Sequence, residues 1–325
     1  TKRALITGGA GFIGSHVADR FLAGGWTVEI IDNLSSGKRD NVPAGAKLHL
    51  LDVQSPDAAR IVTEGRFDAV AHLAAQIDVR RSVSDPVFDA QVNILGSLNL
   101  LEAVRRAGAD GGARFVFAST GGAIYGDLAA PPTTETTPKD PDSPYGIAKL
   151  AVEHYMAYYG RIHGVETASV RFSNVYGPRQ DPHGEAGVVA IFCGRILDGR
   201  ALTVFGDGRQ TRDYVHVGDV AEAVFRATTI KLPPRGAVDA RAFNIGTGIA
   251  TSVVDLASTL MRAVNATAPI EFAPSRPGEQ MQSFLRVERA RDVLGWTPRV
   301  PLERGLAETY AYFAARARPA AAARS

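Results

Sequence analysis

The 325-residue sequence predicts an α/β fold with a doubly wound parallel sheet and a smaller C-terminal α/β lobe. Short apolar runs alternate with amphipathic helical segments over the first half of the chain, the pattern of repeated β-α-β units. A glycine-rich turn joins the first apolar run to the first helix. After Pro178 the alternation weakens. We therefore expect a Rossmann-type domain in residues 1–177, with return segments near 212–247, and mainly a second lobe in 178–325.

The first predicted strand, residues 4–7, leads into a turn with glycines at positions 8, 11 and 14. Residues 12–22 place apolar side chains on one helical face, and Gly24-Gly25 follows as a stop signal. A Cβ in such a turn would block the chain reversal, the approach of a pyrophosphate and the contact of helix with strand. Since a helix N-terminus also offers free N–H groups to phosphate, the turn is predicted to bind a dinucleotide.

The second strand, residues 27–31, ends at Asp32, which lies 18 residues beyond Gly14. A carboxylate there accepts hydrogen bonds from both hydroxyls of an adenosine ribose and repels a 2′-phosphate, so NAD is predicted rather than NADP. The third strand, residues 48–51, is followed by Asp52. Two interpretations of Asp52 stand equally: contact with the adenine amino group, or a helix-initiating or loop acid.

Further strands at residues 68–73 and 114–118, with a helix from Val87 to Arg106 between them, continue the β-α-β pattern. Ligands of such sheets bind beyond the carboxyl ends of the strands. Ala74-Ala75 and Ser119-Thr120 are therefore expected near the dinucleotide.

The composition predicts a soluble, cytoplasmic protein. Hydrophobic residues make up 45% and charged residues 22% of the chain, and the net charge of +2 gives no electrostatic argument for binding nucleic acid or an anionic membrane. The sequence contains no long apolar span and no recognisable signal peptide. Its one cysteine, Cys193, lies in an apolar run and is expected in the core, and the histidines show no paired spacing, so no metal site is predicted.

Tyr145 and Lys149 carry the catalytic prediction. Ser143-Pro144 supplies an N-cap and a first-turn proline, so a helix is expected to begin there and to place both residues on one face. An ammonium group beside a phenol, with a nicotinamide cation nearby, is expected to lower the pKa of the phenol from about 10 towards neutrality. Tyr145 then takes a proton from an alcohol hydroxyl while hydride leaves the same carbon.

The chain resembles the extended short-chain dehydrogenase/reductase family, and within it the UDP-sugar 4-epimerases of the UDP-glucose (galactose) 4-epimerase type. The resemblance extends from Arg3 to about Glu308. Besides the glycine turn and the Tyr145–Lys149 pair, it rests on Asp32-Asn33-Leu34-Ser35-Ser36-Gly37, His72-Leu73-Ala74-Ala75-Gln76, Arg171-Phe172-Ser173-Asn174-Val175-Tyr176-Gly177-Pro178, Arg212-Asp213-Tyr214-Val215-His216-Val217 and Arg276-Pro277-Gly278-Glu279.

The resemblance implies an NAD-dependent isomerase that acts on a UDP-sugar. Relatives hold the nucleotide diphosphate with residues that match Asn174, Arg212 and Arg276, and guanidinium groups suit diphosphate oxygens. Glu279 is expected to contact the uridine ribose.

The resemblance also implies a homodimer, formed through the helices around 87–106 and 145–160. The residues predicted to bind the cofactor are Gly8, Gly11, Phe12, Ile13, Gly14, Asp32, Asn33, Ser36, Gly37, Asp52, Val53, Leu73, Ala74, Ala75, Gln76, Asn93, Ser119, Tyr145 and Lys149. Those predicted to bind the substrate are Thr120, Gly121, Tyr145, Asn174, Val188, Arg212, Arg276, Glu279 and Ser283.

One position departs from the pattern of relatives. They commonly carry Ser or Thr at the place occupied here by Gly121, where the hydroxyl hydrogen-bonds the reacting sugar oxygen. Thr120 is the nearest hydroxyl and is predicted to assist Tyr145. The alternative is that Tyr145 works with little help.

The same segment bears on the type of reaction. Relatives that dehydrate their sugar use an Asp-Glu pair at the positions of Gly122 and Ala123, and those that decarboxylate UDP-glucuronate commonly have a glutamate in this region. Neither residue of this chain can carry a proton. Epimerisation needs no such group: the sugar is oxidised at C4, turns about its diphosphate, and takes hydride back on the other face. The glycines at 121 and 122 are also expected to leave space for that rotation.

The sequence leaves open which sugar the UDP-sugar substrate carries. Relatives control the room for an N-acetyl group at the position of Ser283, so UDP-N-acetylglucosamine is a candidate beside UDP-glucose, which is placed first. Arg80-Arg81-Ser82 raises UDP-glucuronate as an option, although contacts with Asp78 and Asp85 are favoured. The alternatives are a UDP- or dTDP-sugar 4,6-dehydratase, a UDP-glucuronate epimerase or decarboxylase, and an NAD-sensing regulatory protein, which would not need the Tyr145–Lys149 pair.

Overall fold

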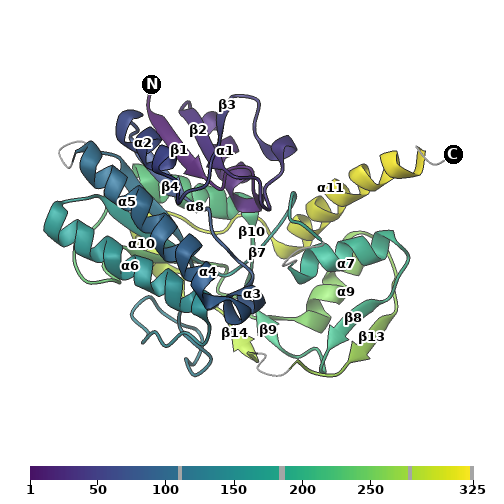
Figure 1. The fold of residues 1–325 in the computed structure, drawn as a ribbon. Helices are drawn as coiled ribbons and strands as arrows, with labels where there is room; N and C mark the ends of the chain where they lie inside the picture. Colours follow the sequence, from purple (N-terminus) through teal and green to yellow (C-terminus); the bar gives the residue numbers. More distant parts are fainter. Residues whose placement is uncertain (109–111, 183–186, 277–279, 323–325) are drawn as a thin grey trace.

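The computed structural model describes residues 1–108, 112–182, 187–276 and 280–322, which form a larger and a smaller lobe (Figure 1). The larger lobe is built on a sheet of seven strands, and every neighbouring pair in it is parallel. In spatial order the strands are β11 (Ala242–Ile245), β6 (Thr167–Phe172), β5 (Arg114–Thr120), β4 (Ala69–His72), β1 (Arg3–Thr7), β2 (Thr27–Asp32) and β3 (Ala46–Leu50). This order is that of the Rossmann fold with one added strand, β11, which confirms the predicted fold class.

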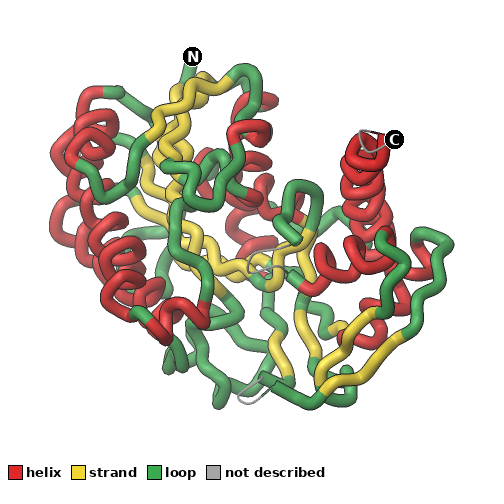
Figure 2. Tube along the Cα trace, turned by 45° about the vertical axis from the view of Figure 1, so that its right-hand side comes forward, coloured by secondary structure: helices red, strands yellow, loops and turns green. Residues whose placement is uncertain are grey.

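Helices lie on both sides of the large sheet (Figure 2). Strand side chains alternate in direction, so Ile6 shares one core with Phe21, whereas Leu5 shares the opposite core with Leu100. The first layer comprises α1 (Phe12–Ala23), α8 (Val217–Thr229) and α10 (Glu288–Leu294), and the second α2 (Pro56–Glu64), α5 (Gly96–Ala107) and α6 (Pro144–His163). None of the helices within the described ranges is long and apolar enough to cross a membrane.

The helix expected from Val87 to Arg106 is present, but it is not uniform. The short helices α3 (Val79–Ser84) and α4 (Pro86–Ala90) lead into a π turn, η2 (Gln91–Leu95), which continues as α5. A π turn adds a residue to one turn of a helix and is frequent at functional sites. Here it carries Asn93 on its buried side, where the side chain meets the loop after β4.

The smaller lobe has a core of its own, formed by α7 (Val188–Leu197), α9 (Val253–Ala263) and α11 (Leu302–Ala322). Cys193 is fully buried in this core, as its apolar neighbours in the sequence predicted. The short strands are β8 (Leu202–Phe205) with β13 (Ile270–Ala273), β7 (Asn174–Tyr176) with β10 (Tyr214–His216), and β9 (Thr211–Arg212) between β12 (Thr251–Ser252) and β14 (Gln282–Ser283).

Candidate active site

The glycine-rich turn lies at the carboxyl end of β1, against the end of β4 (Figure 1). Gly8 has φ +69°, and a Cβ on it would come within 2.7 Å of the Ala74 backbone nitrogen. A Cβ on Gly14 would lie 2.0 Å from the carbonyl oxygen of Gly8. α1 begins at Phe12 with Gly11 as its N-cap and no capping side chain, so the first N–H groups of the helix are available to an anion. The turn thus fits a dinucleotide pyrophosphate.

Backbone amides hold both oxygens of the Asp32 carboxylate. One oxygen accepts a hydrogen bond of 3.0 Å from the Ala10 amide, and the other accepts one of 2.8 Å from the Leu34 amide. A Cβ on Gly37 would lie 2.9 Å from the Asp32 carboxylate, so only glycine leaves that oxygen open. Each carboxylate oxygen keeps a free lone pair, which suits the ribose hydroxyls predicted to bind there.

The loop after β2 is tied to the loop after β3. The side-chain amide of Asn33 donates a hydrogen bond of 2.9 Å to Asp52, whose other oxygen accepts from the Gln54 amide. Asp52 does not cap α2, because Ser55 is the N-cap residue. The helix-initiating interpretation of Asp52 is therefore wrong, whereas a loop acid and a contact with the adenine amino group both stay predictions. The contact with Asn33 places Asp52 beside the loop of Asp32. Of the other predicted residues here, Val53 is buried and Ser36 is exposed.

A chain of buried hydrogen bonds fixes the end of β4. Thr7 Oγ1 accepts from the amides of Leu73-Ala74, so its hydroxyl donates to His72 Nδ1 at 2.6 Å. His72 Nε2 then donates to Ser97, which donates to the carbonyl of Asn93. Burial lowers the pKa of His72 to about 3, so this ring is neutral. Thr7 opens the glycine-turn motif, but sequence reasoning assigned it no role, and Ser97 was not found from the sequence.

Gln76 and Asn93 were predicted to contact the cofactor, but their side chains are engaged inside the protein. Asn93 Oδ1 accepts from the Gln76 amide, and Asn93 Nδ2 donates to the Gln76 carbonyl, both at 2.9 Å. Both side-chain amides also donate to one oxygen of Asp89, at 3.0 and 2.9 Å. Gln76 and Asn93 thus shape the loop after β4 through Asp89, a residue that sequence reasoning missed.

The catalytic pair lies at the start of α6, as predicted. Ser143 caps the helix by accepting from the Gly146 amide at 3.1 Å. Lys149 is buried, its Nζ donates a hydrogen bond of 2.9 Å to the Ala118 carbonyl, and it lies 5.7 Å from the centre of the Tyr145 ring. Burial lowers the pKa of Lys149 to about 8.

The predicted direction of the Tyr145 pKa is wrong for the groups of the protein itself. Desolvation raises the pKa of the phenol, and the negative charge of Asp89 raises it further. The expectation counted the ammonium group of Lys149 and a nicotinamide cation, and it left out burial, which the sequence does not display. For the pKa of Tyr145 to fall, the positive charges of Lys149 and a nicotinamide cation must outweigh desolvation.

Two hydroxyls stand at the carboxyl end of β5. Ser119 Oγ is buried and has no hydrogen-bond partner among the described residues. Thr120 Oγ1 accepts from the Ala123 amide at 3.2 Å, which leaves its hydroxyl proton free to be donated. Thr120 is therefore able to donate to a sugar oxygen.

The two glycines that follow differ in the space around them. A Cβ on Gly121 would lie 2.5 Å from a methyl carbon of Leu285, whereas the nearest atom to a Cβ on Gly122 is Thr120 Oγ1, at 3.9 Å. The predicted space exists at Gly122 and is absent at Gly121. Leu285 also leaves no room for a serine at position 121, the residue type found there in relatives.

The predicted substrate residues lie mainly on the smaller lobe. Arg212 of β9 is the register partner of Ser283 of β14, and its guanidinium donates to the Gln280 carbonyl at 2.7 Å. Asn174, in β7, is exposed.

Arg276, Val188 and Glu279 are the remaining residues predicted to bind the substrate. The exposed Arg276 stacks its guanidinium 3.9 Å from the centre of the Phe205 ring. Val188 is the first residue of α7 and is partly buried. Glu279 lies outside the described residues.

Comparison with known proteins identifies the family. The model of the NAD dependent epimerase/dehydratase family matches residues 4–246. A UDP-glucose 4-epimerase of Mycolicibacterium smegmatis is 45% identical over 316 residues, which cover 96% of this chain and 98% of the relative.

Two solved structures agree with this match. The UDP-glucose 4-epimerase of Thermotoga maritima with UDP-glucose has a TM-score of 0.90 and 44% identity, with 97% of this chain and 99% of that one covered. The Thermus thermophilus UDP-glucose 4-epimerase in complex with NAD has a TM-score of 0.86 and 44% identity, with 96% and 98% covered. The chain belongs to the NAD dependent epimerase/dehydratase family, which confirms the resemblance read from its motifs.

Proposed function

We infer that the protein is an NAD-dependent isomerase that inverts C4 of a UDP-sugar, with UDP-glucose and UDP-galactose as the first substrate pair. The observation that carries this inference is the position of the Tyr145–Lys149 pair, held against the end of β5 in a chain 45% identical to a UDP-glucose 4-epimerase. The glycine turn and Asp32 lie at the same edge of the sheet.

When bound, NAD supplies the acceptor that takes hydride from the sugar and returns it. We propose that the turn from Gly8 to Gly14 binds its pyrophosphate through the N-terminus of α1, and that Asp32 accepts the adenosine ribose hydroxyls. In this proposal, residues 1–177 with the return segments near 212–247 bind the cofactor, and 178–325 mainly bind the substrate.

Proton movement falls to Tyr145. Its phenolate takes the proton of the C4 hydroxyl as hydride leaves and gives it back after the 4-keto sugar has turned. The positive charge of Lys149 stabilises the phenolate, and the Thr120 hydroxyl donates a hydrogen bond to the reacting oxygen. The open space beside Gly122 supports rotation of the sugar.

The lack of proton carriers at Gly122 and Ala123 favours epimerisation over dehydration or decarboxylation. Both of those reactions belong to relatives with acidic side chains in this segment. The intact Tyr145–Lys149 pair likewise argues against a regulatory protein that binds NAD without turnover.

The substrate diphosphate is assigned to Arg212, Arg276 and Asn174, because guanidinium groups pair well with phosphate oxygens. Ser283, beside Arg212 in the small sheet, is short enough to leave room for an N-acetyl group, so UDP-N-acetylglucosamine is the second candidate. A uronic acid is disfavoured, since Arg80 lies 3.8 Å from the carboxylate of Asp78.

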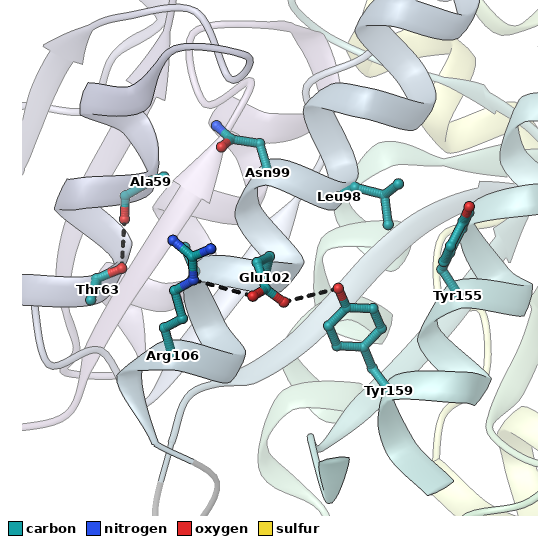
Figure 3. A pocket seen from close by; sticks show the side chains of 9 residues that line it. Ala59, Thr63, Leu98, Asn99, Glu102, Arg106, Tyr155 and Tyr159 are labelled. Atoms are coloured by element: carbon teal, nitrogen blue, oxygen red, sulfur yellow. Dashed lines mark hydrogen bonds and ion pairs between the residues drawn. The ribbon is translucent and has the colours of Figure 1, made fainter. Parts of the chain in front are cut away.

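The protein is proposed to act as a cytoplasmic homodimer. Apolar side chains of α4, η2 and α6 are exposed: Val87 at 66%, Leu95 at 57%, Ile147 at 53% and Ile162 at 62%. Residues of α2, α5 and α6 also line a groove of about 370 Å³, where Tyr159 donates to Glu102 at 3.0 Å (Figure 3). A second copy of this chain would cover these side chains with the same apolar surface.

Proton NMR of the C4 configuration tests the reaction, with UDP-glucose, UDP-N-acetylglucosamine and UDP-glucuronate incubated separately with the protein and NAD. Conversion of any of them to its galacto isomer, lost in Tyr145→Phe and kept in Tyr158→Phe, is the expected result. Tyr158 is the matched control because it lies on α6 and is 44% exposed. A 4-keto, deoxy or pentose product would contradict the epimerase.

A further inference from the structure

Asp89 is a buried acid beside the catalytic helix that the proposed reaction does not use. It lies on α4, is 1% exposed, and precedes the π turn that carries Asn93. One of its oxygens accepts both side-chain amides described above, from Gln76 at 3.0 Å and from Asn93 at 2.9 Å. α4 and the π turn pack against α6, which bears Tyr145 and Lys149.

The second oxygen of Asp89 is buried and has no hydrogen-bond partner among the described residues. An acceptor left without a donor costs about 1–3 kcal/mol, and more when it is charged. Simple anchoring of Gln76 and Asn93 needs only an amide oxygen, which an asparagine would supply at lower cost. A carboxylate at this position therefore calls for a reason that depends on its charge.

The catalytic pair supplies that reason. The negative charge of Asp89 raises the pKa values of Lys149 and Tyr145. Burial raises the pKa of the Asp89 carboxyl. The hydrogen bonds from the side-chain amides of Gln76 and Asn93 lower it, and so does the positive charge of Lys149. The three groups are thus electrostatically coupled.

Two other titratable groups bear on the pair: Glu153, whose negative charge also raises the pKa of Lys149, and His72. Glu153 of α6 forms a buried ion pair with Arg171 of β6. His72 of β4 is neutral.

The acids nearest along the chain are helix caps. Asp85 caps α4, and Asp78, in the loop after β4, caps α3 and lies beside Arg80.

We propose that Asp89 is a positioning residue of the Tyr145–Lys149 pair: one oxygen fixes Gln76 and Asn93, and the negative charge keeps the buried ammonium of Lys149 protonated. This role deepens the proposed epimerase reaction and rests on it. Because it acts through Lys149 and Tyr145, Asp89 sets the pH range of the reaction and makes no contact with the substrate.

Asp89→Asn tests the charge with little change of shape. The amide oxygen still accepts from Gln76 and Asn93, and the charge is lost. Both Lys149 and Tyr145 then release their protons at lower pH. The first readout is the phenolate absorbance of Tyr145 in the NAD-bound protein, taken as the difference between Asp89→Asn and the same variant with Tyr145→Phe. The midpoint of this difference is expected about one pH unit below the midpoint of the difference between the parent protein and Tyr145→Phe.

The second readout is the pH profile of kcat with UDP-glucose. The whole profile is expected to move to lower pH by the same amount, with KM unchanged. Asp219→Asn is the control: Asp219 is also buried, and it accepts the backbone amides of Arg299 and Val300 far from the pair. It should lower stability and leave both midpoints in place.

The outcomes separate cleanly. A folded Asp89→Asn protein with unmoved midpoints would overturn the proposal and leave Asp89 as a structural acid. A moved phenolate midpoint without conversion of any UDP-sugar would support the coupling and contradict the epimerase. If Asp89→Asn does not fold, Asp89→Ser removes the same charge with less volume, and the same midpoints decide.

Discussion

The ammonium nitrogen of Lys149 donates a 2.9 Å hydrogen bond to the carbonyl oxygen of Ala118, which ties the catalytic helix α6 to strand β5. Ser119 and Thr120, the last two residues of β5, follow Ala118 directly. The proposed base, the ammonium group beside it and the proposed assisting hydroxyl are therefore placed by α6 and β5, which this hydrogen bond joins.

Lys149→Met removes this charge and leaves a side chain of similar length. The phenolate of Tyr145 then loses its stabilising cation, and kcat is expected to fall by about 100-fold or more. Steady-state assays with UDP-glucose measure the loss. Lys47→Met, at a lysine whose side chain is 68% exposed, is the control and should keep full activity.

Gly121→Ala and Gly122→Ala form a matched pair of neighbouring substitutions. The first drives a methyl group into Leu285 and should lower the free energy of unfolding by about 1–3 kcal/mol. The second meets no atom closer than 3.9 Å, so stability should change by less than about 0.5 kcal/mol while kcat falls as the rotating sugar loses space. Urea unfolding and activity are measured on both. Equal loss of stability in the two would contradict the difference in packing.

The buried His72 predicts a loss of stability in acid. Its pKa is lowered to about 3 by burial, whereas an unfolded histidine binds a proton near pH 6.5. The unfolded chain therefore holds the extra proton between these values, and the free energy of unfolding falls by about 1.4 kcal/mol per pH unit as pH drops from 6.5 towards 3.

His72→Gln should flatten this dependence by that amount in urea titrations from pH 6 to pH 4. His154→Gln, at an exposed histidine, should leave the slope of the parent protein unchanged. An unaltered slope in His72→Gln would mean that the ring is not buried in its neutral form.

Ile162→Glu tests the proposed dimer. It places a charge in the exposed apolar surface of α6, where Ile162 is 62% exposed, so the paired state should dissociate to monomers in sedimentation velocity. Ile249→Glu changes an isoleucine of the smaller lobe with 63% exposure and should leave the dimer intact. Dissociation by both variants, or by neither, would count against the surface proposed here.

Much of the site could be predicted because each part leaves a local signal. Glycines spaced around a helix start, an acid after the second strand, and Ser-Pro ahead of Tyr145 and Lys149 are all determined by neighbours in sequence. The capped start of α6 and the close approach of Gly8 to Ala74 follow from those signals.

What the sequence left out depends on contacts between distant segments. Leu285 fills the space beside Gly121 from far along the chain. Asp89 gains its surroundings from a π turn that no hydrophobic periodicity announces. The direction of the Tyr145 pKa depends on burial, which exists only once the helices have packed.

Strand β11 joins the sheet beside β6 only after the chain has built strands of the smaller lobe. A fragment cut at residue 177 would leave β6 as a bare edge, with its backbone amides and carbonyls ready to pair with another molecule. It would also uncover the apolar face that α8 shields. The two lobes are consequently not interchangeable modules, and recombination at their boundary should yield aggregates.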